Sequence, residues 1–120
     1  MGCAHLSCLK LTTFYFVLLE YSYIFERRGI TEFDMADGNS NLINTDDWGL
    51  VITGCMVRHD FAVLLQNNGV FTVDFSEGTS DRLNLDNWSN CIGAIHTTGN
   101  NVLAFCKNGS LYSLPFFVYS

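Results

Sequence analysis

The chain has 120 residues, 48% of them hydrophobic and 15% charged, and its formal net charge is −6. This composition, with a single proline, excludes a disordered or linker-rich protein and allows one small domain with its own hydrophobic core. Acidic side chains outnumber basic ones, and Arg27 and Arg28 are the only adjacent basic residues. Because such a surface repels phosphate backbones, we expect no nucleic-acid partner.

The first 28 residues differ from the rest in composition. Their apolar run, Leu11–Leu19, is too short to span a bilayer. It has the size of the hydrophobic part of a signal peptide, but it lacks a basic segment and a cleavage site of small residues. The opening Met1-Gly2 lacks the Ser or Thr that N-myristoylation requires, because Leu6 stands in that position. We predict that residues 1–28 contain no membrane span and are either a degenerate copy of the repeat described below or an unrelated segment.

The five cysteines form an odd set without close pairs, and the three histidines are scattered. Zinc sites need closely spaced ligands, so we predict no metal site and expect free thiols. Unpaired cysteines favour the cytoplasm over secretion. The apolar N-terminus and two glycosylation sequons, at Asn87 and Asn108, favour export, so the compartment stays open.

A 40-residue repeat begins at residue 29. Residues 29–68 align without gaps with residues 69–108, and a partial third copy covers residues 109–120. Nine columns are identical, where unrelated sequences would give about two or three. The identical pairs are Gly29/Gly69, Asp34/Asp74, Gly38/Gly78, Ser40/Ser80, Asn44/Asn84, Asp46/Asp86, Trp48/Trp88, Ile52/Ile92 and Asn68/Asn108.

Each copy has the pattern strand, turn, strand. Two apolar runs, Phe61–Gln66 and Val70–Phe75, flank Asn67–Gly69, and Asn-Gly predicts a hairpin because both residues tolerate positive φ. The segment Glu77–Ser80 predicts the next turn, and Arg82–Leu85 a short outer strand. About four short strands per copy are typical of propeller blades, sandwiches and barrels. We predict an all-β fold of antiparallel four-stranded repeat units belonging to a β-propeller.

A closed propeller needs four to eight blades, and this chain carries fewer than three copies of the repeat. Three solutions remain open. The chain is a fragment of a longer propeller, assembles in several copies into a ring, or closes as a small sandwich. The first two are favoured, and both predict an exposed apolar sheet face and self-association.

The repeated tryptophans and aspartates are predicted to be scaffold. Trp48 and Trp88 are expected to bury their rings between sheets and to donate the indole N–H to a backbone carbonyl. Asp46 and Asp86 are expected to accept backbone N–H groups and brace the loop before each Trp.

Residues 88–112 resemble the repeat of the regulator-of-chromosome-condensation family, particularly its bacterial relatives. The shared order is Trp88, the apolar strand Ile92–Ile95, the second strand Val102–Phe105, Asn108-Gly109 and an apolar strand; residues 48–71 repeat it. The Gly and His that the family places before its second strand are absent here. The pairing of a Trp with a later Gly-aromatic strand is also similar to tectonin and tachylectin-like lectins. The first resemblance implies a propeller that contacts proteins, and the second implies sugar binding.

No catalytic motif, phosphate-binding loop or metal-binding motif is present, so we predict a non-enzymatic protein without a cofactor. The first functional hypothesis is a protein partner bound by the Arg58-His59-Asp60 loop and its counterpart, residues 98–100, which differ between copies.

The second hypothesis is a lectin, with sugar lodged against a Trp ring and held by neighbouring polar groups. Its residues are Asp46, Trp48, Asp86, Asn87 and Trp88. The third hypothesis is a truncated fragment without a function of its own.

Overall fold

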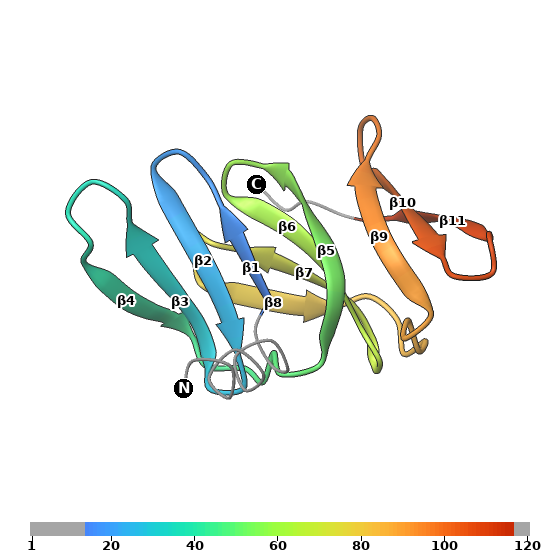
Figure 1. Ribbon diagram of the computed structural model, residues 1–120, viewed down its shortest axis with the longest axis horizontal. Helices are drawn as coiled ribbons and strands as arrows, with labels where there is room; N and C mark the ends of the chain where they lie inside the picture. The colour runs from blue at the N-terminus through green and yellow to red at the C-terminus, as the bar shows by residue number, and fades with distance from the viewer. Residues whose placement is uncertain (1–13, 117–120) are drawn as a thin grey trace, which may run out of the picture. The chain divides into compact units, whose positions relative to one another are not determined.

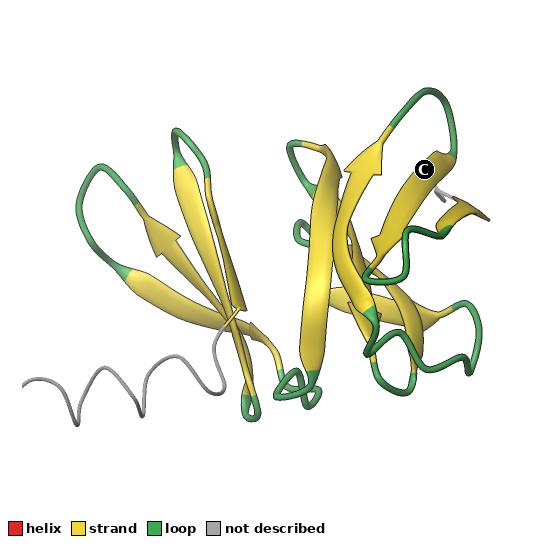
Figure 2. Ribbon diagram, turned by 45° about the vertical axis from the view of Figure 1, so that its right-hand side comes forward, coloured by secondary structure: helices red, strands yellow, loops and turns green. Residues whose placement is uncertain are grey.

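The computed structural model describes residues 14–116, and this part of the chain contains strands, turns and loops but no helix (Figure 2). Its eleven strands form three antiparallel sheets in chain order (Figure 1). The first sheet contains β1 (Phe14–Val17), β2 (Tyr21–Glu26), β3 (Gly29–Asp34) and β4 (Ser40–Asn44). The second contains β5 (Val51–Arg58), β6 (Phe61–Gln66), β7 (Gly69–Asp74) and β8 (Thr79–Arg82). The third contains β9 (Cys91–His96), β10 (Asn101–Cys106) and β11 (Leu111–Pro115).

The prediction of an all-β fold of antiparallel four-stranded units is therefore confirmed, and the third sheet has three described strands. The chain divides into two compact units, Met1–Val51 and Ile52–Ser120. The first sheet lies in the first unit, and nearly all of the other two sheets lies in the second.

Sheets and sequence copies are offset by half a repeat. The copy 29–68 supplies the last two strands of the first sheet and the first two strands of the second. The boundary expected at residue 28 thus falls in the turn between β2 and β3, and part of the apolar run Leu11–Leu19 forms β1. Met1-Gly2, Leu6 and the first two cysteines lie outside the described residues.

The β6–β7 hairpin forms where Asn-Gly predicted it, but its turn differs. Gln66 pairs with Gly69, so Asn67 and Asn68 make the two-residue loop, and no described residue other than glycine has positive φ. Gly69 has φ 144°, and a Cβ there would overlap the carbonyl oxygen of Asn84. Gly29 has φ 137°, and a Cβ there would overlap the carbonyl oxygen of Asn44. Only glycine fits both positions, which explains why both copies have it.

The outer strand, predicted at Arg82–Leu85, is β8 at Thr79–Arg82. It begins three residues earlier than predicted because the turn before it ends at Gly78. The Asp74 carboxylate accepts the backbone N–H groups of Ser76 (2.9 Å) and Glu77 (3.1 Å). Gly78, with φ 72°, donates its N–H to the Asp74 carbonyl at 2.8 Å, so pairing resumes at Thr79. An aspartate that caps its own turn in this way explains the repeated Asp-x-x-x-Gly spacing.

The core of the second unit lies between its two sheets. The inward face of β6 carries Phe61, Val63 and Leu65, which pack with Val102 and Ala104 of β10. Val70, Trp88, Cys91 and Phe116 complete this buried cluster. In the first unit, Phe25 and Trp48 are buried with their rings edge to face, 5.6 Å between centroids.

Within residues 14–116 no helix has the length and hydrophobicity that crossing a membrane requires.

Candidate functional site

Antiparallel strands place successive connections at opposite ends of the strands, and the candidate residues of the second unit are divided between these two ends. Here an edge means the row of connections at one end of the strands. We call one edge the Arg58 edge: it holds the turn at His59-Asp60 and the Phe75–Gly78 turn. The other is the Trp88 edge: it holds the turn at Asn67-Asn68 and the connection Leu83–Asn90. The candidates Asp86, Asn87 and Trp88 therefore lie at the edge opposite the Arg58 loop. Asp46 and Trp48 occupy the matching connection of the first unit.

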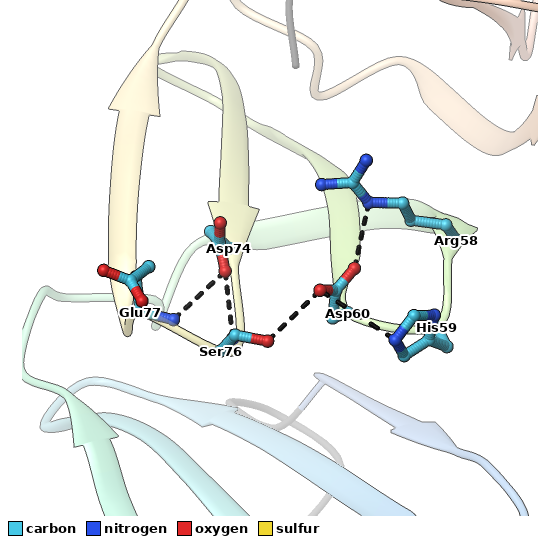
Figure 3. Close-up of polar contacts among 6 residues, drawn as sticks. All are labelled: Arg58, His59, Asp60, Asp74, Ser76 and Glu77. Atoms are coloured by element: carbon cyan, nitrogen blue, oxygen red, sulfur yellow. Dashed lines mark hydrogen bonds and ion pairs between the residues drawn. The ribbon is translucent and has the colours of Figure 1, made fainter. Parts of the chain in front are cut away.

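The Arg58 edge is held together by the carboxylate of Asp60 (Figure 3). One of its oxygens accepts the Arg58 Nε–H at 2.9 Å, and the other accepts the Ser76 hydroxyl at 3.1 Å. The carbonyl of Asp60 accepts the Phe75 N–H at 2.8 Å, so both turns are joined by backbone and side chain. His59 Nε2 lies 3.9 Å from the same carboxylate while its side chain remains 89% exposed.

These contacts set the protonation of the carboxyl group. Partial burial of Asp60 raises its pKa, but hydrogen bonds from Ser76 and Arg58, with the nearby charges of His59 and Arg58, outweigh that effect. The pKa is therefore lowered below its ordinary value, and Asp60 is ionised at neutral pH. The Arg58 guanidinium also lies 5.4 Å from the centre of the Phe61 ring.

The same edge of the third sheet is built from different side chains. There His96 Nε2 lies 2.8 Å from the Gly99 carbonyl, and the Thr97 hydroxyl donates to the Asn101 carbonyl at 3.3 Å. The backbone link persists, because Phe116 N–H donates to the Asn100 carbonyl as Phe75 does to Asp60. The predicted recognition loops thus share a backbone frame and differ in chemistry.

The repeated Asn, Asp and Trp form a hydrogen-bonded cluster in each of the connections that precede β5 and β9. Asn44 Oδ1 accepts the indole N–H of Trp48 at 2.9 Å and the backbone N–H of Asp46 at 2.8 Å. Asn84 repeats both bonds, to Trp88 at 3.4 Å and to Asp86 at 3.1 Å.

These bonds correct the predicted acceptor of the indole N–H groups. Each indole donates to an asparagine side chain rather than to a backbone carbonyl, and the same asparagine oxygen also accepts the backbone N–H two residues further on. The Asp46 carboxylate accepts a hydrogen bond from Asn44 Nδ2 at 3.3 Å. Sequence reasoning missed the role of Asn44 and Asn84, although their identity in both copies was a signal for it.

Both indoles are buried, with Trp48 1% and Trp88 8% exposed. Little of either ring is accessible for a sugar to stack on, so the structure does not support a lectin site built on these two rings. Phe25 covers Trp48, and Tyr112 lies edge to face with Trp88 at 5.7 Å. Their role in the structure is to fill cores.

A hollow of about 270 Å³ lies beside Trp88. Its lining combines polar side chains with two cysteines and the rings of Trp88 and Tyr112. The lining residues are Asp86, Asn87, Trp88, Asn90, Cys91, Cys106, Asn108 and Tyr112. Within the described residues no group of three or more His, Cys, Asp or Glu side chains is placed to hold a metal ion.

Neither a protein-family model nor a curated protein matches this sequence. Similar solved structures exist at low identity. The computationally designed Ika4 protein has a TM-score of 0.61 at 10% identity, covering 86% of this chain and 64% of its own. PorZ, a surface component of the type-IX secretion system of Porphyromonas gingivalis, has 0.60 at 15%, covering 87% and 15%. A chain of the S. cerevisiae complex of Dbp5 bound to Nup159 and Gle1 has 0.58 at 14%, covering 88% and 28%.

These likenesses show the fold alone, which agrees with a propeller-like arrangement of strands. The chain spans less than two thirds of the length of each of these three proteins. The resemblances to the condensation-regulator and tectonin families stay predictions.

Proposed function

We propose that this chain is a non-enzymatic binding module of the β-propeller kind that contacts a protein partner through the Arg58 edge of its second sheet. The observation that carries the proposal is the double hold on Asp60 by Arg58 and Ser76, at 2.9 and 3.1 Å. It fixes two neighbouring turns in one arrangement while leaving Arg58 and His59 at the surface.

Such an arrangement favours binding because it is formed in advance. A partner need not immobilise the long Arg58 side chain, since Asp60 and the Phe61 ring already restrict it. Only the Nε–H of Arg58 is used in the bond to Asp60 (Figure 3), and the side chain is 42% exposed, so its terminal amino groups are available as donors. Arginine is enriched at the centres of protein interfaces for this reason. A partner surface rich in carboxylate or carbonyl oxygens would complement it.

The fold comparisons support this proposal without deciding it. One similar chain comes from a complex of several proteins, which is a statement about that complex. The same edge differs in its side chains between the second and third sheets while it keeps its backbone bonds, as expected of recognition loops carried on a rigid frame.

The test uses site-specific cross-linking followed by affinity measurement. A photoreactive amino acid at position 59 should capture a discrete partner, while the same group at position 68, in the exposed turn of the opposite edge, should not. With that partner purified, Arg58→Ala should weaken binding at least about 10-fold, the effect of removing an interface hot spot. Lys107→Ala, a basic truncation on a turn of the third sheet, should leave affinity unchanged. Equal capture from both positions, or equal loss in both variants, would refute the assignment of this edge.

A second candidate is association between copies of the chain. Large apolar side chains are exposed along one strand of each unit: Tyr15 and Val17 on β1 are 58% and 68% exposed, and Ile92 on β9 is 64% exposed. Exposed apolar residues grouped in this way favour contact with another apolar surface. Light scattering over a concentration series should then show a mass above that of the monomer, and Val17→Lys or Ile92→Lys should lower it. A monomer at every concentration would exclude this candidate.

A further inference from the structure

Cys91 and Cys106 face each other across β9 and β10, in the wall of the hollow beside Trp88. They are direct partners in the strand register. The register shifts next to them, between the consecutive residues Phe105 and Cys106 of β10. The Cys91 N–H donates to the Trp88 carbonyl, and the Cys106 N–H donates to the Ser110 carbonyl, both at 2.9 Å. Neither amide is used in a bond between the two cysteines.

The bond that flanks this pair identifies its type. Lys107 N–H donates to the Asn90 carbonyl at 2.8 Å, which links the residue after Cys106 to the residue before Cys91. That is the pattern around a non-hydrogen-bonded antiparallel pair, in which Cα atoms lie about 4.5 Å apart and both side chains project from the same face. Disulfides require Cα atoms about 4.4–6.8 Å apart, a range that includes the spacing of such a pair.

The surroundings of the two thiols show that they influence each other. Burial raises the pKa of the Cys91 thiol, and the adjacent Cys106 thiol raises it further. Cys91 is buried, whereas Cys106 is partly exposed, and both reach the hollow. A small oxidant can therefore reach Cys106 first, with Cys91 next to it.

The repeat itself does not require cysteine at these places. One repeat earlier, Val51 and Gln66 occupy the columns of Cys91 and Cys106. Cys55 differs because it does not line the hollow: it packs against the core, and burial raises its pKa to about 11. It has the surroundings of an inert structural thiol.

We propose that Cys91 and Cys106 are a redox-active pair that closes into a reversible disulfide in the presence of a peroxide. The Cys106 thiolate attacks the O–O bond of hydrogen peroxide, giving a sulfenic acid and hydroxide. The Cys91 sulfur, as it loses its proton, then displaces the oxygen of that sulfenic acid, which leaves as water. In total two thiols and one peroxide give one disulfide and two waters, with two electrons passing from sulfur to oxygen. A dithiol reductant reverses the change.

Closing the bond ties the start of β9 to the end of β10 and fixes one wall of the hollow. We expect the oxidised chain to unfold at a higher temperature than the reduced chain, by at least roughly 4 °C. The shift should vanish on addition of dithiothreitol.

The experiment uses the full chain with Cys3, Cys8 and Cys55 changed to Ser, so that only the proposed pair remains. Stoichiometric peroxide should remove two hydrogen atoms from the intact mass, and digestion without reductant should yield one peptide joined through residues 91 and 106. Cys91→Ser in that background should stop at a sulfenic acid trapped by dimedone. Oxidised wild-type chain, digested in the same way, should give the same joined peptide, which keeps the test valid if the triple variant does not fold.

Two results would overturn the proposal. One is accumulation of trapped sulfenic acid at Cys106 while Cys91 is present and no joined peptide forms. The other is that peroxide gives only disulfides between chains.

Discussion

The side chain of Asn44 lies against the indole of Trp48, with its Oδ1 accepting the Nε1–H at 2.9 Å inside the first unit. The same oxygen accepts the backbone N–H of Asp46, so one amide satisfies a buried ring and a loop together. This bond holds the Trp48 ring from its polar end, and the Phe25 ring packs against it in an edge-to-face pair.

Replacing Asn44 by Ala should therefore lower the free energy of unfolding by about 1–3 kcal/mol, because the Trp48 N–H is left buried without its acceptor. Urea denaturation followed by tryptophan fluorescence measures this. Asn41→Ala, the same substitution at an exposed position of β4, should change stability by less than about 0.5 kcal/mol. Asn84→Ala should cost less than Asn44→Ala, since its bond to Trp88 is longer, at 3.4 Å.

Gly69→Ala should destabilise the second unit by more than about 2 kcal/mol. Its φ of 144° is strained for any other residue, and the new Cβ would overlap the Asn84 carbonyl oxygen. Gly93→Ala is the matched control, because no atom lies within 4 Å of a Cβ placed there. Thermal unfolding of both variants checks the expectation, and similar midpoints would contradict the strain argument.

Leu65→Ala should cost about 2–5 kcal/mol, because this fully buried side chain fills the space between the two sheets of the second unit. Ile92→Ala removes a comparable volume from a side chain that is 64% exposed and should cost less than about 1 kcal/mol. Chemical denaturation of the two variants measures the difference. A small effect of Leu65→Ala would mean that the two sheets do not share this core.

Stability should depend on pH through Asp60. Its pKa is lower in the folded chain than in the unfolded chain, so its contribution is present above the unfolded value, about 3.9, and is lost as pH falls through the folded value. The group lies near the surface, which keeps the contribution below about 1 kcal/mol. Asp60→Asn should therefore be less stable than the wild type at pH 7, and the gap should narrow below about pH 4. An unchanged gap down to pH 2 would contradict the ion-pair account.

The hairpins and the repeat could be predicted because their causes are local. Gln66 and Gly69 are three residues apart, and the pattern of apolar residues on either side specifies the pairing. The start of β8 was predicted less well, since it depends on how Asp74 caps a turn through backbone groups whose conformation the composition does not specify. For the candidate site, the loop Arg58-His59-Asp60 was found from its difference between copies, whereas the contribution of Ser76 was not.

The sequence by itself determined that this protein is built from antiparallel strands in a repeat of 40 residues, because glycine, turn and apolar spacings act over a few residues. Only the tertiary structure decided that the second and third sheets each join the end of one copy to the beginning of the next. It also decided which partners meet across strands: Asp60 with Ser76, 16 residues on, and Cys91 with Cys106, 15 residues on. Contacts of that separation follow from the register of whole strands, which is set by burial on both sides of the sheet rather than by the residues in contact.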